Sequence, residues 1–184
     1  MRVIAGTFRG KKLNAPEGET TRPTSDRARE MVFDILAARL LKQGRLWRDV
    51  SLADVFAGSG AVAAEALSRG AREVFCFETD HRAVQCLNEN MRGWAGVHLM
   101  GDALTPPQHA PISVLFMDAP YGRGLWQRAL PAFLRAGWID DKTVIIIETD
   151  AALNETLPAD FTCTQTRAAG RNTFLFGYWN GKEP

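Results

Sequence analysis

The sequence predicts a doubly wound α/β fold with a mostly parallel sheet of seven strands that ends in an antiparallel hairpin. From about residue 49 onward, short apolar runs alternate with helical segments, a pattern typical of a parallel sheet covered on both faces. A glycine-rich turn separates the first apolar run from the first of these helices, where such sheets bind ligands. The last two apolar runs flank a short polar turn, which predicts the hairpin.

Size and composition indicate one globular domain. The chain has 184 residues, of which 46% are hydrophobic and 23% charged. No apolar run approaches the roughly 20 residues of a membrane span. The cysteines Cys76, Cys86 and Cys163 have neither disulfide nor metal-ligand spacing. We therefore expect a cytoplasmic protein without a metal. The sequence does not fix the oligomeric state, and a monomer is the simplest expectation.

The first 48 residues predict a basic extension. Two short strands are expected at residues 2–7 and 11–15, followed by a helix that Thr24 or Ser25 caps and that reaches about Leu41. Residues 1–48 carry eleven Lys and Arg against five Asp and Glu, whereas residues 49–184 carry eleven against sixteen. A basic extension on an acidic α/β domain indicates one surface for a polyanion and another site for a cation.

The elements of residues 49–184 follow one another as strand and helix. Strands are expected at Ser51–Phe56, Glu73–Glu78, Val97–Met100, Ile112–Met117 and Thr143–Glu148. Helices are expected at Ala61–Arg69, His81–Arg92 and within Leu125–Ala136, where Pro131 should restart the helix. The closing hairpin is expected to pair Thr162–Arg167 with Thr173–Trp179.

The glycine-rich turn is the candidate cofactor site. Gly58 and Gly60 lie between the first strand and its helix, where backbone amides approach a ligand closely. With Ala63 they also fit a loose dinucleotide pattern, so a nicotinamide cofactor is an alternative.

Acidic residues at strand ends favour one cofactor over the other. They are Asp54, Glu78, Asp102 and Asp118. Glu78 is placed to bind a ribose diol. Four carboxylates around one pocket would repel the pyrophosphate of a dinucleotide but suit a sulfonium cation and its ammonium group. We therefore expect S-adenosylmethionine.

The tetrapeptide Asp118-Ala119-Pro120-Tyr121 is the candidate site of chemistry. An exocyclic amino group of a base is a poor nucleophile because its lone pair is delocalised into the ring. Hydrogen bonds from its N–H groups to Asp118 and to the carbonyl of Ala119 would localise that lone pair and aim it at a methyl group. Tyr121 would stack on the base. The pattern predicts methylation of a base amine.

Motifs along nearly the whole chain resemble the bacterial 16S ribosomal RNA guanine-N2 methyltransferases of the RsmD type. They include Arg2-Val3-Ile4-Ala5-Gly6, Arg22-Pro23-Thr24, Asp54-Val55-Phe56-Ala57-Gly58-Ser59-Gly60 and Glu65-Ala66-Leu67-Ser68-Arg69-Gly70. Many methyltransferases share the glycine loop, whereas the amino-terminal arginine motifs are far more particular. The resemblance implies a Rossmann-like methyltransferase fold and S-adenosylmethionine as the cofactor. It also implies that the methyl acceptor is a guanine of 16S RNA in an assembling small ribosomal subunit. The family's tetrapeptide has two adjacent prolines, and Ala119 replaces the first.

The resemblance also implies roles for individual residues. Those expected around the cofactor are Asp54, Phe56, Gly58, Ser59, Gly60, Glu78, Asp102 and Ala103. Those expected at the target base are Asp118, Ala119, Pro120 and Tyr121. Those expected to hold RNA are Arg2, Arg9, Lys11, Lys12, Arg22 and Arg29.

Other functions fit the sequence less well. A DNA amino-methyltransferase uses a similar tetrapeptide but needs a target-recognition region, and about 50 residues lie outside the α/β core here. A methyltransferase that acts on a different base amine of RNA is a second alternative. A nicotinamide-dependent oxidoreductase is a third, and a non-enzymatic RNA-binding module leaves the clustered acids unexplained.

Overall fold

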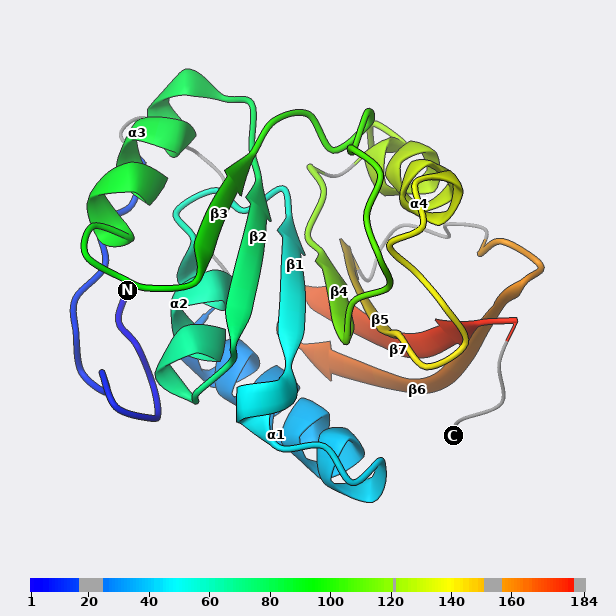
Figure 1. The fold of residues 1–184 in the computed structure, drawn as a ribbon, viewed down its shortest axis with the longest axis horizontal. Helices are drawn as coiled ribbons and strands as arrows, with labels where there is room; N and C mark the ends of the chain where they lie inside the picture. Colours follow the sequence, from blue (N-terminus) through cyan, green and yellow to red (C-terminus); the bar gives the residue numbers. More distant parts are fainter. Residues whose placement is uncertain (17–24, 121, 151–156, 181–184) are drawn as a thin grey trace.

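A seven-stranded sheet forms the centre of the molecule in a computed structural model that describes residues 1–16, 25–120, 122–150 and 157–180. The strand order is β3-β2-β1-β4-β5-β7-β6 (Figure 1). The strands are β1 (Ser51–Val55), β2 (Glu73–Phe77), β3 (Val97–Met100), β4 (Val114–Met117), β5 (Val144–Asp150), β6 (Phe161–Ala169) and β7 (Asn172–Trp179). The helices are α1 (Asp26–Lys42), α2 (Ala61–Ser68), α3 (His81–Asn90) and α4 (Leu125–Arg135), with a 3₁₀ turn at Trp47–Asp49.

The five strands β1 to β5 are parallel, and β7 joins β5 antiparallel. This arrangement confirms the predicted sheet and its closing hairpin. Near-continuous apolar strands such as β4 and β5 are buried because helices cover both faces. The register places Val55, Met117 and Ile147 side by side, so β1, β4 and β5 have their carboxyl ends level with one another.

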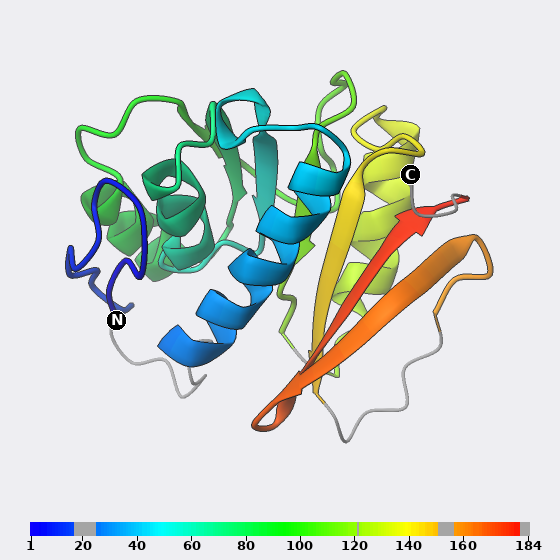
Figure 2. The ribbon, with the colours of Figure 1, turned by 90° about the horizontal axis from the view of Figure 1, so that it is seen from below.

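Helices α1, α2 and α3 cover one face of the sheet, and α4 covers the other (Figures 1 and 2). Apolar residues of α1, including Val32, Phe33 and Leu36, share a core with β1 and β7. On the α4 face, Phe75, Phe77 and Trp138 pack edge to face. A boundary at residue 48 stays a prediction, although α1 packs on the sheet as an integral layer.

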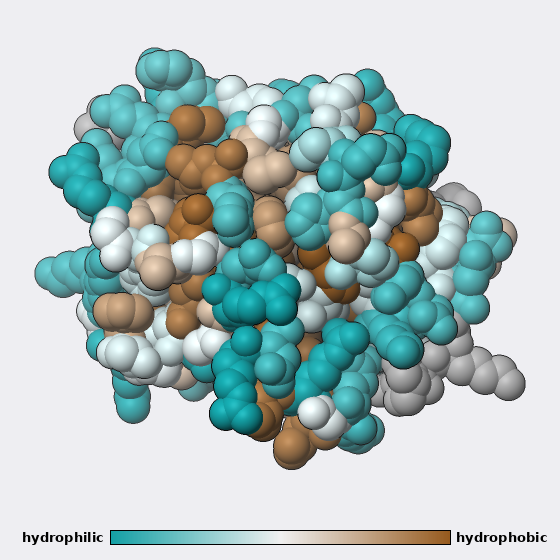
Figure 3. Space-filling model, viewed as in Figure 1, coloured by the Kyte–Doolittle hydropathy of each residue, from teal (hydrophilic) through white to brown (hydrophobic). Residues whose placement is uncertain are grey.

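The two edge strands of the sheet are β3 and β6. Strand β3 lies at the edge of the sheet, and its Leu99 is 47% exposed. Apolar surface is visible in the region of β2 and β3 among otherwise hydrophilic side chains (Figure 3). No helix within the described residues is long and apolar enough to cross a membrane.

The two amino-terminal segments pair antiparallel, with the N–H of Val3 donating to Lys11 and the N–H of Leu13 donating to Met1, but the pairing is too short to form the two predicted strands. Only Arg2 and Lys12 form a β-bridge. The N–H groups of Ile4 and Ala5 are not available to a strand partner because both donate to the carboxylate of Glu65. The segment therefore bends onto α2. Ser25 is confirmed as the residue that caps α1.

Pro131 does not restart the last helix as expected. Helix α4 runs without interruption from Leu125 to Arg135 with Pro131 inside it. Proline removes one backbone donor from the helix. Burial of Trp126, Leu130 and Phe133 against the sheet offsets that loss and keeps the helix continuous.

Candidate functional site

The glycine-rich turn lies between β1 and α2 at the carboxyl edge of the sheet. Gly60 has φ 75°, and a Cβ atom there would overlap the side chain of Leu87. Phe56 has φ 68°, a left-handed conformation that is rare for a residue with a bulky side chain. Such backbone strain concentrates at ligand sites and persists only where neighbouring contacts hold it. The turn therefore has the features of a binding loop.

Glu78 ties this turn to the end of β2. Its carboxylate accepts hydrogen bonds from the N–H of Gly58 at 2.9 Å, of Thr79 at 2.7 Å and of Asp80 at 2.8 Å. A ribose diol would have to bind the same carboxylate beside these amides. Glu78 therefore holds the glycine turn against the end of β2.

Asp54 lies beneath the turn and is 2% exposed. One carboxylate oxygen accepts the N–H of Ala63 in the first turn of α2 at 3.1 Å. Burial raises the pKa of Asp54 to about 7; the Ala63 hydrogen bond opposes this shift, and the negative charge of Glu78 adds to it. Two carboxylates so placed make the floor of the site suitable for a cation.

Asp54 makes folding stability depend on pH. Its pKa is about 7 in the folded protein against an ordinary value of 3.8, so between these values the folded state binds one proton more than the unfolded state. The contribution to the free energy of unfolding is present below pH 3.8 and is lost as pH rises to about 7. We expect a loss of up to about 4 kcal/mol. Asp54→Asn should flatten this dependence because it removes the titration but keeps an acceptor for Ala63. Urea unfolding of both proteins between about pH 5 and pH 8 measures it, and equal slopes would refute the assignment.

Two further predicted residues lie at the end of β3. Asp102 is exposed and accepts the N–H of Leu104 at 2.8 Å, while Ala103 is buried. Asn90 is a residue that sequence reasoning missed. Its amide donates to the carbonyls of Ser59 and Asn14, at 2.9 Å and 3.1 Å, and so ties the glycine turn to the amino-terminal segment. A lone Asn late in a helix gives no sequence signal of this role.

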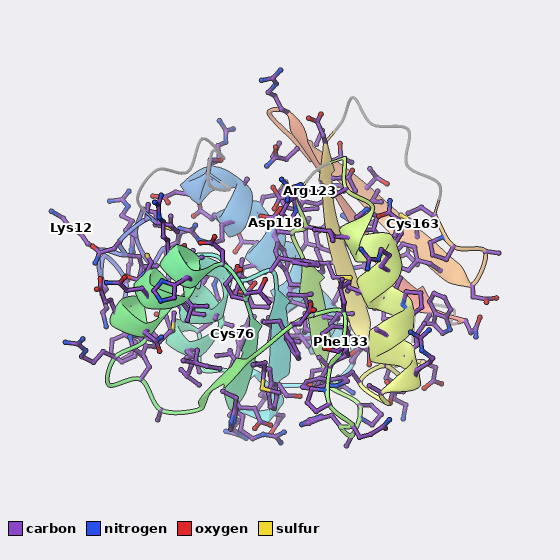
Figure 4. All side chains as sticks on the ribbon, turned by 90° about the horizontal axis from the view of Figure 1, so that it is seen from above. Lys12, Cys76, Asp118, Arg123, Phe133 and Cys163 are labelled. Atoms are coloured by element: carbon purple, nitrogen blue, oxygen red, sulfur yellow. The ribbon has the colours of Figure 1, made fainter. Side chains whose placement is uncertain are left out.

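The turn after β4 lies beside the glycine turn. The N–H of Asp118 donates to the carbonyl of Val55 at 3.3 Å, so the candidate catalytic acid directly adjoins the end of β1. Asp118 lies near the middle of the molecule when it is seen from above (Figure 4). Ala119 is 3% exposed and packs in the core on the α4 face, whereas Pro120 is exposed. Tyr121 lies outside the described residues.

Glu148 is a second residue that sequence reasoning missed. It follows Ile147, the partner of Met117, and is therefore next to Asp118 in register. Its side chain is 1% exposed and accepts a hydrogen bond from Asn172 of β7. The sequence placed Glu148 at the end of the fifth strand, whereas β5 continues two residues further to Asp150.

The structure separates the predicted RNA contacts. Arg9, Lys11 and Lys12 are exposed, and Arg2 is exposed beside Asp26 at 3.4 Å. The prediction that Arg29 contacts RNA is wrong. Arg29 is 2% exposed, donates to the Arg2 carbonyl at 2.6 Å and pairs with Asp26 at 2.9 Å. Its place on the buried face of α1 makes it a structural residue. Arg22 lies outside the described residues.

Comparison with known proteins identifies the family. A family model described as "Conserved hypothetical protein 95" matches residues 1–178. The chain belongs to this family. Ribosomal RNA small subunit methyltransferase D of Escherichia coli (strain K12) is 32% identical over 177 residues, 93% of this chain and 86% of that protein. The protein of the same name from Haemophilus influenzae is 30% identical over 179 residues, 92% of this chain and 89% of that protein.

Solved structures agree with this membership. One described as "Putative methyltransferase yhhF from Escherichia coli" has a TM-score of 0.82, 29% identity and 99% coverage of both chains. The resemblance to methyltransferases of the RsmD type and the Rossmann-like methyltransferase fold are therefore confirmed. A nicotinamide-dependent oxidoreductase and a non-enzymatic RNA-binding module no longer fit.

Proposed function

We propose that this methyltransferase uses S-adenosylmethionine to methylate the exocyclic N2 amine of a guanine in 16S ribosomal RNA. The observation that supports this most is the contact between Asp118 and the end of β1, which brings the candidate catalytic acid next to the glycine turn. The names of the Escherichia coli and Haemophilus influenzae relatives support ribosomal RNA of the small subunit as the substrate.

The residues around the glycine turn fit the proposed cofactor. Glu78 would bind the ribose diol, and Asp102 with Ala103 would border the adenine. Asp54 and Glu78 place two carboxyl groups near a cationic ligand, and a bound cation would favour the ionised form of Asp54, whose pKa burial raises to about 7. When bound, S-adenosylmethionine supplies an activated methyl group, and the electrons of the broken carbon–sulfur bond stay on the sulfur.

The catalytic turn would prepare the amine. The carboxylate of Asp118 accepts a hydrogen bond from one N–H of the guanine N2 group and stabilises the positive charge that develops on the nitrogen as the new carbon–nitrogen bond forms. The carbonyl of Ala119 accepts from the other N–H. Both contacts localise the nitrogen lone pair and hold it in line with the methyl group. The proton that the nitrogen loses passes to Asp118 or to water.

Exposed basic residues of the amino-terminal segment would bind the RNA backbone. Reversal of charge at three positions should weaken RNA binding and flatten its salt dependence: Arg9→Glu, Lys11→Glu and Lys12→Glu. Each lost phosphate contact reduces the slope of the logarithmic plot by about 0.7–0.9. Affinity for S-adenosylmethionine should not change. Binding isotherms for a 16S transcript over a range of salt concentrations measure both effects.

A matched control uses three exposed basic residues on the α4 side: Arg128→Glu, Arg135→Glu and Lys142→Glu. This variant has the same net charge as the first and should bind RNA more tightly than it does. If both variants lose affinity and salt slope equally, the amino-terminal segment has no special role in binding.

Methyl transfer tests the proposed function directly. The protein is incubated with S-adenosylmethionine labelled in its methyl group and with a 16S transcript, small-subunit particles or duplex DNA. We expect label in the 16S RNA of the transcript or the particles, and none in DNA. Label in DNA alone, or binding of NADH without binding of S-adenosylmethionine, would overturn the proposal.

A further inference from the structure

The amino-terminal turn (residues 6–12) is held rigidly against α2. Glu65, which is fully buried, accepts the N–H groups of Ile4 at 2.7 Å and Ala5 at 3.1 Å and pairs with Arg69 at 2.8 Å. The hydroxyl of Ser68 accepts the N–H of Phe8 at 2.9 Å. A buried carboxylate is costly unless it is fully bonded, so this anchor fixes the position of the turn.

Close approach of the backbone adds to the anchor. Gly6 has φ 83°, and a Cβ atom there would overlap the carbonyl of Ser68. That carbonyl also accepts the N–H of Thr7 at 2.8 Å. The turn is therefore locked to the end of α2 by its backbone, which leaves its side chains free to face outward.

An aromatic and basic cluster projects from this turn. Phe8 is 45% exposed, and its ring centroid lies 4.4 Å from that of Trp94, which follows α3. The ammonium of Lys11 lies 4.5 Å from the Trp94 ring and 5.9 Å from the Phe8 ring. Arg9 and Lys12 flank the cluster and are exposed. We refer to Phe8, Lys11 and Trp94 as the aromatic platform.

Packing explains only part of this arrangement, because Trp94 is partly buried against the core on the α1 side whereas Phe8 is not. Phe8 does not belong to either buried core, and nearly half of its side chain is in contact with water. Aromatic rings next to cations are the surface on which unpaired nucleic-acid bases stack, because the ring contacts the base and the cation binds the adjoining phosphate. The chemistry of the platform thus fits a single-stranded segment of RNA.

The platform lies apart from the candidate catalytic turn. Lys12, at the end of the amino-terminal turn, projects outward at one side of the molecule, whereas Asp118 lies near the middle (Figure 4). Because Lys12 directly follows Lys11 of the platform, we infer that a base stacked on Phe8 is not the base that is methylated. It must belong to another part of the same RNA.

We propose that Phe8 and Trp94, with Lys11, bind an unpaired base of the RNA substrate by stacking, at a second point away from the target guanine. This inference rests on the proposed function, because it requires an RNA substrate. It assigns a binding role to Phe8 and Trp94 in addition to the electrostatic role of Arg9, Lys11 and Lys12.

The decisive comparison replaces Phe8 with leucine and with tyrosine. Leucine keeps an apolar contact with Trp94 but removes the aromatic face, whereas tyrosine keeps that face. Phe8→Leu should weaken binding of a 16S transcript about fivefold or more, with an unchanged salt slope, and Phe8→Tyr should bind as the unaltered protein does. Lys11→Gln should instead lower the salt slope. Equal melting temperatures and equal affinity for S-adenosylmethionine establish that the variants are folded.

Trp94 gives a second, spectroscopic readout. Addition of oligouridylate should quench part of the tryptophan fluorescence of the protein, and Trp94→Phe should lose that part while retaining most of the affinity. A perfect RNA duplex of the same length should cause no such quenching. These results would support the platform.

Two outcomes overturn the inference and are distinguishable from each other. If the unaltered protein methylates 16S RNA but Phe8→Leu binds it with unchanged affinity, the platform is wrong and the proposed function stands. If the unaltered protein neither binds nor methylates 16S RNA, both are wrong.

Discussion

Asp118→Ala is expected to lower the rate of methyl transfer by about a hundredfold or more, the range observed when a positioned acid–base group is removed. The proposed partner of the Asp118 carboxylate is the target amine, which is otherwise a poor nucleophile. The backbone N–H of residue 118 still reaches the Val55 carbonyl in the variant, so the turn should keep its place beside β1. Melting temperature and affinity for S-adenosylmethionine should therefore stay close to those of the unaltered protein.

The matched variant is Asp118→Asn, which has nearly the same shape and keeps one oxygen acceptor but no negative charge. It should retain more activity than Asp118→Ala and less than the unaltered protein. Rates under single-turnover conditions with saturating cofactor separate methyl transfer from binding. Near-normal turnover of the alanine variant, or a large loss of cofactor affinity, would show that Asp118 does not act on the amine.

Glu78→Ala should weaken S-adenosylmethionine binding by about 1.5–3 kcal/mol, as expected for loss of hydrogen bonds to a charged group. Two effects contribute to this change. The ribose diol loses its acceptor, and the N–H groups of Gly58, Thr79 and Asp80 lose the carboxylate that holds the loop. RNA affinity should be unaffected because the exposed basic residues lie on another segment.

Glu78→Gln distinguishes the two effects. Glutamine keeps one oxygen that can still accept from a loop amide, so melting temperature should recover more than cofactor affinity does. Titration calorimetry with S-adenosylmethionine and thermal unfolding of all three proteins give both quantities. Unchanged cofactor affinity in Glu78→Ala would remove Glu78 from the binding site.

Much of the α/β core was predictable because its signals are local. The apolar run of β5 indicated a strand buried on both faces, and its pairing with β4 and β7 bears this out. Asp80 and Gly60 showed where α3 and α2 begin, since a cap or a left-handed glycine acts within a few residues of the chain.

Other features depend on residues far apart in the chain, and no local pattern reveals them. Residues 4 and 5 lose their strand pairing to Glu65, which is 60 positions away from Ala5. Arg29 is a basic residue in a basic segment and was therefore predicted to contact RNA. It lies instead on the buried face of α1 and donates a hydrogen bond to the Arg2 carbonyl.

The positions of the acidic residues of the site were predictable from the sequence, but their burial and protonation were not. The acids at the strand ends indicated a cationic ligand. The register places Asp118 at the carboxyl edge of the sheet, where the sequence predicted it. The sequence did not indicate that Asp54 is buried and titrates near neutrality. That property arises from desolvation under the glycine turn and from the charge of Glu78.

The most direct test of the account is the chemical identity of the methylated nucleoside. After reaction of the protein with S-adenosylmethionine and 16S RNA, the RNA is digested to nucleosides and analysed by mass spectrometry against N2-methylguanosine and N6-methyladenosine standards. We expect N2-methylguanosine at one site, and a much lower yield of it in the same reaction time with Asp118→Ala. N6-methyladenosine, a methylated ribose or a ring-carbon methylation would contradict the proposed role of the Asp118 turn.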